Sequence, residues 1–340
     1  MDRPDSVTSI DFTRIRKILI VRLGKIGDIV VTSFTFEVLK NSYPHLEIHL
    51  FTLDSNRSVV KYNPRINKVI YTKKNISLYL KIFSLRKEQY DMILDFNDNA
   101  STTSAFIFKY VTAGIKASYD FDKYKRYINF KITPLRKDKS HIIERMQNFL
   151  SQLGLVFDKN LVKPYFYIGS GELQEVTDEI KLRIKDENII AINLSAGAKI
   201  RYWGIDKWIE LFRSIDVEYN NFFFIFLSTN NDSLMRQQLV DLMKSSNYMI
   251  GSHTSIQHFA AYIKSAKLLI TPDTSAVHIA SAFGVPTIAL YPNPEWNYIS
   301  WQPYGVAHQS IRSSSEHVND ISVEKVFTKF KSLINEIGLT

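Results

Sequence analysis

Residues 17–28 read KILIVRLGKIGD and decide how the first part of this chain folds. The apolar run 17–22 is typical of a buried strand, and Gly24 and Gly27 indicate a tight turn directly after it. Apolar residues then recur at helical spacing from Ile29 to Leu39. A strand, a glycine turn and a helix in this order predict the first unit of a parallel α/β sheet.

The same alternation of apolar runs and helical patterns continues through both halves of the chain. Further strands are predicted at 47–53, 92–95, 189–194, 222–227, 267–271 and 285–290, and helices at 77–88, 102–111, 141–153, 206–215, 232–243 and 255–265, with one more ending at Phe283. We expect Asp206 to be the N-cap of its helix. The polar, basic and aromatic segment 119–139 is expected to be a surface loop.

A length of 340 residues suits two domains rather than one. The segment 154–171, which contains Lys163-Pro164 and two glycines near its end, is typical of a domain exit. We therefore predict α/β domains at 1–168 and 169–340, with the last helix a candidate for packing back on the first domain.

Composition excludes several classes of protein. The chain is 45% hydrophobic and 23% charged, which excludes disorder, and it has no Cys for disulfides or thiolate metal sites. Acidic residues near the N-terminus argue against an export signal, and the longest apolar runs, such as 222–227, are far shorter than the ~20 residues of a membrane span. We expect a soluble, cytoplasmic protein that can touch a membrane.

The net charge of +9 is unevenly distributed. Residues 1–170 carry 28 basic and 16 acidic side chains, whereas residues 171–340 carry 15 and 18. A basic first half indicates an anionic partner such as a phosphorylated substrate, a membrane surface or nucleic acid, and a simple solubility effect is the alternative. Basic and aromatic residues mingle at 119–131, but no nucleic-acid-binding motif accompanies them, so we expect no nucleic acid.

The turn 24–28 is the first candidate site. Gly24, Lys25 and Gly27 can present backbone N–H groups at a helix start, although the spacing is neither GxGxxG nor a P-loop. Asp28 follows the carboxyl end of a strand, where ligands of open α/β sheets bind, so it is placed to act as a general base. A helix-capping or first-turn acid is an equally good interpretation.

The second candidate site is Asp273-Thr-Ser-Ala-Val-His278, between an apolar strand and an Ala-rich helix. Its small residues, Ser275 and Ala276, leave helix-start N–H groups open to a phosphate, and Asp273 could accept hydrogen bonds from sugar hydroxyls. The alternative is an N-cap acid followed by a buried histidine.

Two further segments of the second half follow strands. In 195–203 (SAGAKIRYW), Lys199 or Arg201 could neutralise a pyrophosphate leaving group, whereas an exposed basic loop with Trp203 in the core is the alternative. Asp232 could hold a ribose, with a simple N-cap as the alternative. No metal-binding motif is visible, so we expect no metal and no cofactor.

Three segments in this order resemble the bacterial ADP-heptose:lipopolysaccharide heptosyltransferases of glycosyltransferase family 9. They are 18–28, then 193–198 before Trp203, and then Asp273-Thr-Ser-Ala-Val-His-Ile-Ala280 before Gly284-Val-Pro286. The resemblance implies a GT-B architecture of two Rossmann-like, doubly wound domains facing across a cleft. It also implies an inverting, metal-independent transfer from a nucleotide-sugar, held mainly by the second domain, to an acceptor on the first.

The resemblance also assigns roles to individual residues. Asp28 is similar to the family's base, Asp273 to the acid that contacts the donor sugar, and Asp232 to an acidic residue that binds the ribose. Thr274, Ser275 and His278 fall in the segment that holds the diphosphate, and we count Ala276 and Ser195 as further donor-binding candidates. The anionic acceptor, the core of lipopolysaccharide, implies work at the cytoplasmic face of the inner membrane.

The sequence departs from the family pattern at three points. The family's Lys-x-Trp-Pro is Arg201-Tyr-Trp203-Gly204 here, so Arg201 would supply the cation, with Lys199 as a substitute. Ser275 replaces a glycine, and Ser228-Thr-Asn-Asn231 replaces a glycine-rich turn. A different nucleotide-sugar donor, a nucleotide-sugar 2-epimerase and a non-catalytic glycan- or nucleotide-binding protein therefore stay open as alternatives.

Overall fold

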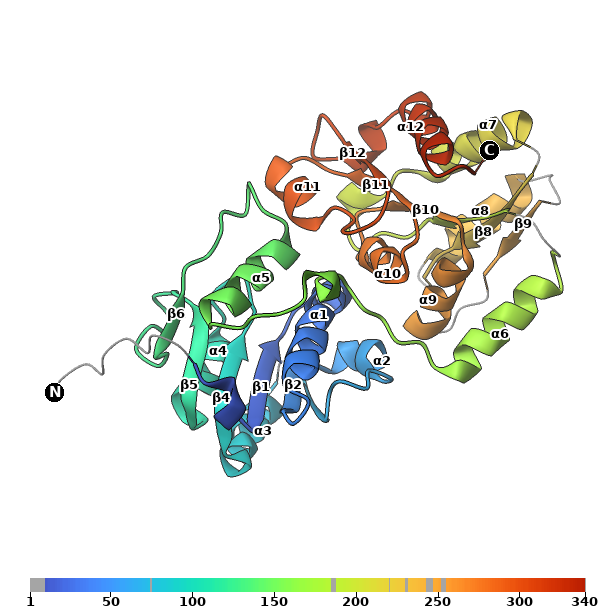
Figure 1. Ribbon diagram of the computed structural model, residues 1–340. Helices are drawn as coiled ribbons and strands as arrows, with labels where there is room; N and C mark the ends of the chain where they lie inside the picture. Colours follow the sequence, from blue (N-terminus) through green and yellow to red (C-terminus); the bar gives the residue numbers. More distant parts are fainter. Residues whose placement is uncertain are drawn as a thin grey trace. The chain divides into compact units, whose positions relative to one another are not determined.

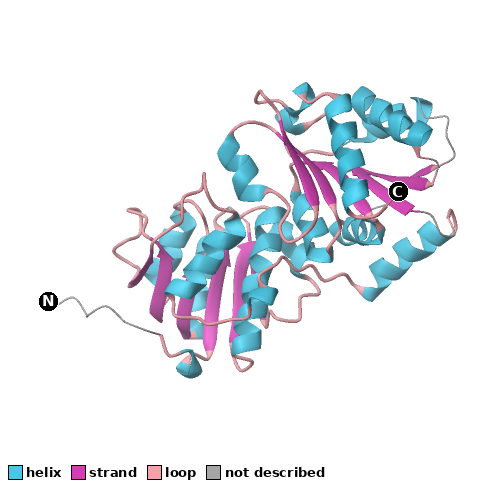
Figure 2. Ribbon diagram, turned by 45° about the horizontal axis from the view of Figure 1, so that its top comes forward, coloured by secondary structure: helices cyan, strands magenta, loops and turns pink. Residues whose placement is uncertain are grey.

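The computed structural model describes residues 10–339 except 74, 185–187, 220, 230–231, 243–246 and 252–254. The chain forms two compact units, unit 1 with Met1–Arg136 and Ile142–Lys163, and unit 2 with Lys137–His141 and Pro164–Thr340. Each unit contains a six-stranded parallel sheet with helices packed beside it (Figures 1 and 2). The predicted α/β fold class is confirmed. Among the described residues, none of the helices combines the length and the apolar character needed to cross a bilayer.

The sheet of unit 1 has the strand order β3-β2-β1-β4-β5-β6. Its strands are β1 (Lys17–Arg22), β2 (Glu47–Leu53), β3 (Lys68–Thr72), β4 (Tyr90–Asp95), β5 (Ala113–Tyr119) and β6 (Phe130–Ile132). Its helices are α1 (Ile26–Ser42), α2 (Arg57–Val60), α3 (Ser77–Leu85), α4 (Thr102–Tyr110) and α5 (Ile142–Gln152). From β1 the chain adds strands β2 and β3 on one side, and then β4, β5 and β6 on the other side. The loops after β1 and β4 therefore leave toward opposite faces of the sheet, and this switch point is where open sheets bind ligands.

The two faces of this sheet are covered by different helices. Leu19 and Val21 of β1 join a core cluster with apolar side chains of α3 and α4. Side chains alternate along a strand, so Ile18 and Ile20 face the opposite side, and both are fully buried. Helices α1 and α5 pack against each other (Figure 1). A sheet covered on both faces explains why β1 is apolar without alternation.

Unit 2 repeats the same topology, because its strand order β9-β8-β7-β10-β11-β12 matches that of unit 1 strand for strand. Its strands are β7 (Asn188–Asn193), β8 (Phe222–Leu227), β9 (Tyr248–Ile250), β10 (Leu268–Pro272), β11 (Thr287–Tyr291) and β12 (His308–Arg312). Its helices are α6 (Ser170–Lys181), α7 (Ile205–Glu218), α8 (Ser233–Leu242), α9 (Ile256–Ser265), α10 (Ser275–Phe283), α11 (Glu295–Trp301) and α12 (Val323–Glu336). The switch point therefore lies between β7 and β10.

The last helix, α12, packs on α7 within unit 2. Phe330 of α12 is fully buried, and its ring lies 5.9 Å from that of Phe222 on β8. The loop before α12 is held by Trp203, whose indole Nε1–H donates to the Ile321 carbonyl oxygen at 2.8 Å. Trp203 is completely buried and makes an edge contact with Trp208. The interpretation of Trp203 as a core residue is therefore correct.

The structure differs from the local expectations at three points. The expected loop 119–139 contains the short edge strand β6, which pairs with β5, and its Tyr124 is fully buried. Asp206 lies in the first turn of α7 and is not its N-cap, because the chain enters the helix at Gly204 with φ of 105°, a conformation that favours glycine. The sequence does not predict strands β3 and β5, because the apolar run of β3 spans only residues 69–71 and that of β5 is interrupted by Gly114 and Lys116.

The buried carboxylate of Asp95 links β4 to the turn after β1. Its Oδ1 accepts hydrogen bonds from the Asn97 backbone N–H, at 3.0 Å, and from the Asn97 amide, while its Oδ2 accepts one from the Tyr124 hydroxyl at 3.3 Å. Asn97 in turn accepts the Leu23 backbone N–H at 3.2 Å. Burial raises the pKa of Asp95 to about 6, against the weaker effect of the hydrogen bonds from Asn97 and Ser104 and of the Arg22 charge.

The Asp95 carboxyl should make the stability of the protein depend on pH. Its pKa of about 6 exceeds the ordinary 3.8, so its stabilising effect is complete below about pH 3.8 and is lost as pH rises through 6. We expect the free energy of unfolding of the wild type, relative to Asp95→Asn, to fall by on the order of 2–3 kcal/mol over this range. Urea unfolding of both proteins from about pH 4.5 to pH 7 measures the difference, and parallel pH profiles would contradict it.

Candidate active site

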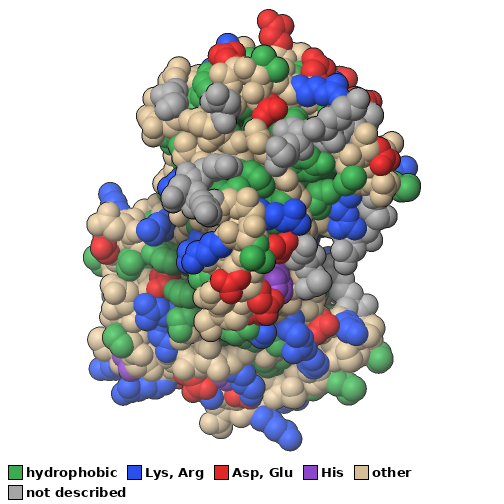
Figure 3. Space-filling view, turned by 90° about the vertical axis from the view of Figure 1, so that its right-hand side faces the viewer, with side chains coloured by type: hydrophobic (Ala, Val, Ile, Leu, Met, Phe, Trp, Pro, Cys, Tyr) green, Lys and Arg blue, Asp and Glu red, His purple; other side chains and the backbone are tan. Residues whose placement is uncertain are grey.

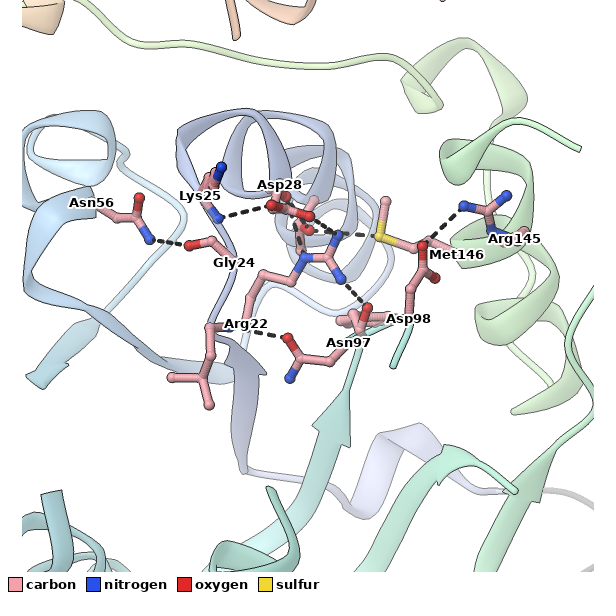
Figure 4. Close-up of polar contacts among 12 residues, drawn as sticks. Arg22, Gly24, Lys25, Asp28, Asn56, Asn97, Asp98, Arg145 and Met146 are labelled. Carbon is pink, nitrogen blue, oxygen red and sulfur yellow. Dashed lines mark hydrogen bonds and ion pairs between the residues drawn. The ribbon is translucent and has the colours of Figure 1, made fainter. Parts of the chain in front are cut away.

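The first polar group lies at the carboxyl end of β1, on the switch point of unit 1. Arg22 ends the strand and is 1% exposed, and its Nη2 lies 2.9 Å from Asp28 Oδ1 (Figure 4). Its Nε donates to the Asp28 carbonyl oxygen at 3.4 Å, and its Nη1 donates to the Phe96 carbonyl oxygen. One buried guanidinium therefore fixes both the main chain and the carboxylate of Asp28.

The second oxygen of the Asp28 carboxylate is held by the helix itself. Asp28 is the third residue of α1, and its Oδ2 accepts the backbone N–H of Lys25, the N-cap residue, at 2.8 Å. Asp28 therefore has the helix-capping role that the sequence analysis gave as the alternative to a general base. The side chain of Asp28 keeps 26% of its surface exposed, and a carboxylate has about four lone-pair sites, so the group can still accept a proton from a substrate.

Gly24 is required by the position of this carboxylate. A Cβ atom at residue 24 would lie 2.4 Å from the Cγ and Oδ2 of Asp28, closer than atoms can approach. The Asn56 amide donates to the Gly24 carbonyl oxygen at 2.9 Å and holds the turn in place. Gly27 is the second residue of α1, and the Lys25 side chain is exposed.

A second ion pair accompanies the first in unit 1. Arg145 of α5 is 2% exposed, and its Nη2 lies 2.9 Å from Asp98 Oδ2 (Figure 4). The sequence interpretation missed Arg22, Asn97, Asp98 and Arg145. Arg22 and 97–98 could have been found, because they follow two adjacent parallel strands whose carboxyl ends meet at one edge of the sheet.

The first polar group of unit 2 surrounds Asp232. Its Oδ2 accepts the Ser195 hydroxyl and, at 2.7 Å, the Thr229 hydroxyl, while its Oδ1 accepts the Tyr202 hydroxyl at 2.8 Å. Burial raises the pKa of Asp232, but hydrogen bonds from Ser195, Thr229 and Tyr202 outweigh it, so the pKa lies below its ordinary value. Asp232 is therefore an ionised acceptor at neutral pH. The last two residues of the predicted turn 228–231 lie outside the described residues.

Asp273 and Arg201 form the second polar group of unit 2. Arg201 Nη1 donates to the Asp273 carbonyl oxygen at 3.0 Å and lies 3.4 Å from Asp273 Oδ2. The Asn297 amide of α11 donates to the same Oδ2 at 2.8 Å. The Arg201 side chain is 33% exposed, whereas Lys199 is exposed and has no ion pair among the described residues. Of the two candidate cations, only Arg201 contacts the Asp273 segment.

The start of α10 adds backbone donors to this group. Thr274 is the N-cap, and its Oγ1 accepts the Ala276 N–H at 3.2 Å, so the alternative that Asp273 caps the helix is wrong. Asn193, at the end of β7, donates to Thr274 Oγ1 at 3.2 Å. Ser275 is partly exposed. His278 is 4% exposed, and its ring lies 5.7 Å from that of Trp301.

The structure thus brings the predicted residues of unit 2 into two groups that join through the β7 end. Ser195 contacts Asp232, Arg201 contacts Asp273, and Asn193 donates to both the Ser195 carbonyl and Thr274. The sequence interpretation did not assign roles to Asn193, Tyr202, Thr229 and Asn297. Tyr202 and Asn193 stand inside or beside segments it singled out, whereas no local pattern marks Asn297.

Comparison with known proteins gives consistent matches. The model of glycosyltransferase family 9 (heptosyltransferase) matches residues 81–331. Lipopolysaccharide heptosyltransferase 1 of Campylobacter coli is 23% identical over 313 residues, which cover 81% of this chain and 83% of that protein.

Solved structures share the fold over nearly the whole chain. A glycosyltransferase family 9 protein of Veillonella parvula has a TM-score of 0.80 at 19% identity, with 94% of this chain and 97% of that chain covered. The ADP-heptose lipopolysaccharide heptosyltransferase II of Escherichia coli has a TM-score of 0.74 at 17% identity, with 95% and 99% covered. The expected pair of Rossmann-like domains of the GT-B type is confirmed.

Replacing Gly24 by Ala tests the packing of the Asp28 carboxylate. The added Cβ must displace the carboxyl group and weaken its contacts with Lys25 and Arg22, which we expect to cost roughly 1–3 kcal/mol of unfolding free energy. Gly197→Ala is the matched control, because a Cβ at Gly197 meets no atom within 4 Å. Chemical denaturation measures both variants, and equal stability would show that the turn yields without cost.

Proposed function

Because the chain belongs to glycosyltransferase family 9, the heptosyltransferase family, we propose that it transfers a heptose from an ADP-heptose-type donor to a lipopolysaccharide-core acceptor. The names of the relatives support this choice of donor and acceptor. The observation that carries the proposal is the Arg201–Asp273 pair at the start of α10, since it offers a cation, a carboxylate and helix-start N–H groups together.

Unit 2 is proposed to bind the donor. The exposed part of the Arg201 guanidinium faces the charge of a departing diphosphate, and the first backbone N–H groups of α10, beginning with that of Ser275, add the partial positive charge of a helix N-terminus. The Asp273 carboxylate accepts hydrogen bonds from the sugar, with His278 in the same segment. The ionised Asp232, held by Ser195, accepts hydrogen bonds from the ribose. Arg201 and the helix-start N–H groups are proposed to offset the leaving charge without a metal.

Unit 1 is proposed to supply the base. Asp28 takes the proton of the acceptor hydroxyl while that oxygen forms a bond to the anomeric carbon from the face opposite the diphosphate. The bond between the anomeric carbon and the diphosphate oxygen breaks, and the electron pair leaves with ADP. The configuration at the anomeric carbon is inverted. Arg22 is a positioning residue, because it orients the Asp28 carboxylate without reaching the reacting atoms.

The charge distribution supports an anionic acceptor. The first 170 residues carry a net charge of +12 and the last 170 a net charge of −3. Figure 3 shows one face of the molecule, where Lys and Arg side chains are interspersed with Asp, Glu and hydrophobic ones. A positive surface raises the local concentration of an anionic substrate. We propose that the protein works at the cytoplasmic face of the inner membrane, where it meets this acceptor.

Substitution of Asp28 by Asn tests the base. We expect turnover to fall by ~10²- to 10⁴-fold, because general base catalysis typically supplies this factor. Binding of ADP, followed as a rise in melting temperature, should be unchanged. Asp122→Asn is the control, since Asp122 is an exposed carboxylate of unit 1 that pairs with Lys125. Near-normal turnover of Asp28→Asn would remove this residue from the mechanism.

Arg201→Ala and Lys199→Ala separate the two candidate cations. Donor-like nucleotides should raise the melting temperature of the wild type, ADP more than UDP or GDP, because a ligand that binds the native state stabilises it. We expect Arg201→Ala to lose most of this shift and roughly 10²-fold in turnover, and Lys199→Ala to keep both. If Arg201→Ala keeps both the melting-temperature shift and the turnover of the wild type, Arg201 is not the cation. A larger melting-temperature shift with UDP or GDP than with ADP would overturn the proposed donor.

A further inference from the structure

The outer face of α3 is as apolar as its inner face. Leu78, Ile82 and Leu85 are buried in the core of unit 1, as expected for a helix that covers a sheet. The opposite face carries Leu80, which is 70% exposed, and Phe83, which is 46% exposed. Ile76, directly before the helix, is 77% exposed. Large apolar side chains gathered on a surface helix indicate a binding surface.

Helix α4 extends this surface and makes it rigid. The ring of Tyr79 on α3 lies 5.1 Å from that of Phe106 on α4, and the ring of Phe83 lies 5.4 Å from that of Tyr110. The Phe106 and Tyr110 rings stack on each other at 5.7 Å. Of the exposed side chains, Phe83 and Tyr79 therefore belong to a packed aromatic layer that joins α3 to α4.

Cations surround the apolar side chains. Lys73 precedes the helix and Arg86 and Lys87 follow it, and all three are exposed. Lys109 of α4 is exposed and lies over the ring of Tyr110, 5.0 Å from its centroid. A second copy of the same surface would bring these cations against their own equivalents, which disfavours a symmetric dimer.

Two acids on segments beside α3 already pair with other cations. Glu88 lies 2.5 Å from Lys68 Nζ and 3.5 Å from Lys17 Nζ, and Asp54 lies 2.8 Å from Arg57 Nη2. The surface therefore combines an apolar centre with a border of exposed cations that have no ion pair among the described residues. This combination is typical of helices that lie in the headgroup region of a negatively charged bilayer.

We propose that α3 and the adjoining side of α4 dock on an anionic phospholipid bilayer. Ile76, Leu80 and Phe83 enter the boundary between headgroups and acyl chains. The headgroups are bound by Lys73, Arg86, Lys87 and Lys109. The biological reason for this docking rests on the proposed function, because a lipid-anchored acceptor would be presented at the surface of an anionic bilayer.

Vesicle binding of the full chain tests the proposal. The protein is sedimented with vesicles of phosphatidylethanolamine and phosphatidylglycerol, and separately with phosphatidylcholine vesicles. We expect binding to the anionic vesicles that weakens with salt, and little binding to the neutral ones. Leu80→Glu/Phe83→Glu should lower the partition coefficient at least tenfold. Reversing the charge of Arg86 or Lys87 should lower it by roughly fivefold or more per residue.

Val217→Glu is the matched control, because Val217 is 89% exposed on α7 of unit 2 and an acid there should leave vesicle binding unchanged. Circular dichroism checks that each variant is folded. Undiminished binding of folded Leu80→Glu/Phe83→Glu, or a dimer of the wild type in light scattering that this variant abolishes, would overturn the proposal. The assay contains neither donor nor acceptor, so a failed transfer reaction with intact vesicle binding would count against the proposed function alone.

Discussion

The burial of Arg22 is the constraint on which the candidate site of unit 1 depends. A guanidinium with 1% exposure is costly unless its charge is paired and its N–H groups find acceptors. Asp28 supplies the charge, and the Phe96 and Asp28 carbonyl oxygens supply the remaining acceptors. Because the same carboxylate also caps α1 through Lys25, its position is set by folding and not by a ligand. The proposed base is therefore in place before any substrate arrives.

Unit 2 uses the same strand order but a different arrangement at its switch point. Arg201 follows β7 and Asp273 follows β10, so this ion pair joins the loops of two adjacent strands, whereas Arg22 and Asp28 belong to one strand and the helix after it. Arg201 is a third exposed and keeps a buried Nε without a hydrogen-bond partner among the described residues. A cation that is only partly satisfied within the chain can still bind an anion, whereas Arg22 is fully committed to the fold.

The sequence predicts those features that depend on neighbouring residues. Apolar runs and helical spacing locate β1, β8 and α10, and the glycine turn and the Asp273 segment identify both candidate sites. The partners of these residues depend on how distant segments meet: Asn297 reaches Asp273 from α11, and Asn97 reaches the β1 turn from β4. Edge strands such as β3 escape prediction for a related reason, since one-sided pairing leaves their side chains half exposed and their pattern irregular.

The positive charge of unit 1 lies mostly away from its candidate site. At the site, Arg22 and Arg145 are neutralised by Asp28 and Asp98. Several exposed cations of unit 1 pair with acids, whereas Lys73, Arg86, Lys87 and Lys109 at the border of α3 have no ion pair among the described residues. Charges placed in this way act at a distance of about a Debye length, ~8–10 Å, and attract an anionic surface or substrate before contact. Different residues of unit 1 therefore serve the chemistry at the site and the long-range attraction of an anion. Exposed cations can be replaced without moving the Asp28 carboxylate.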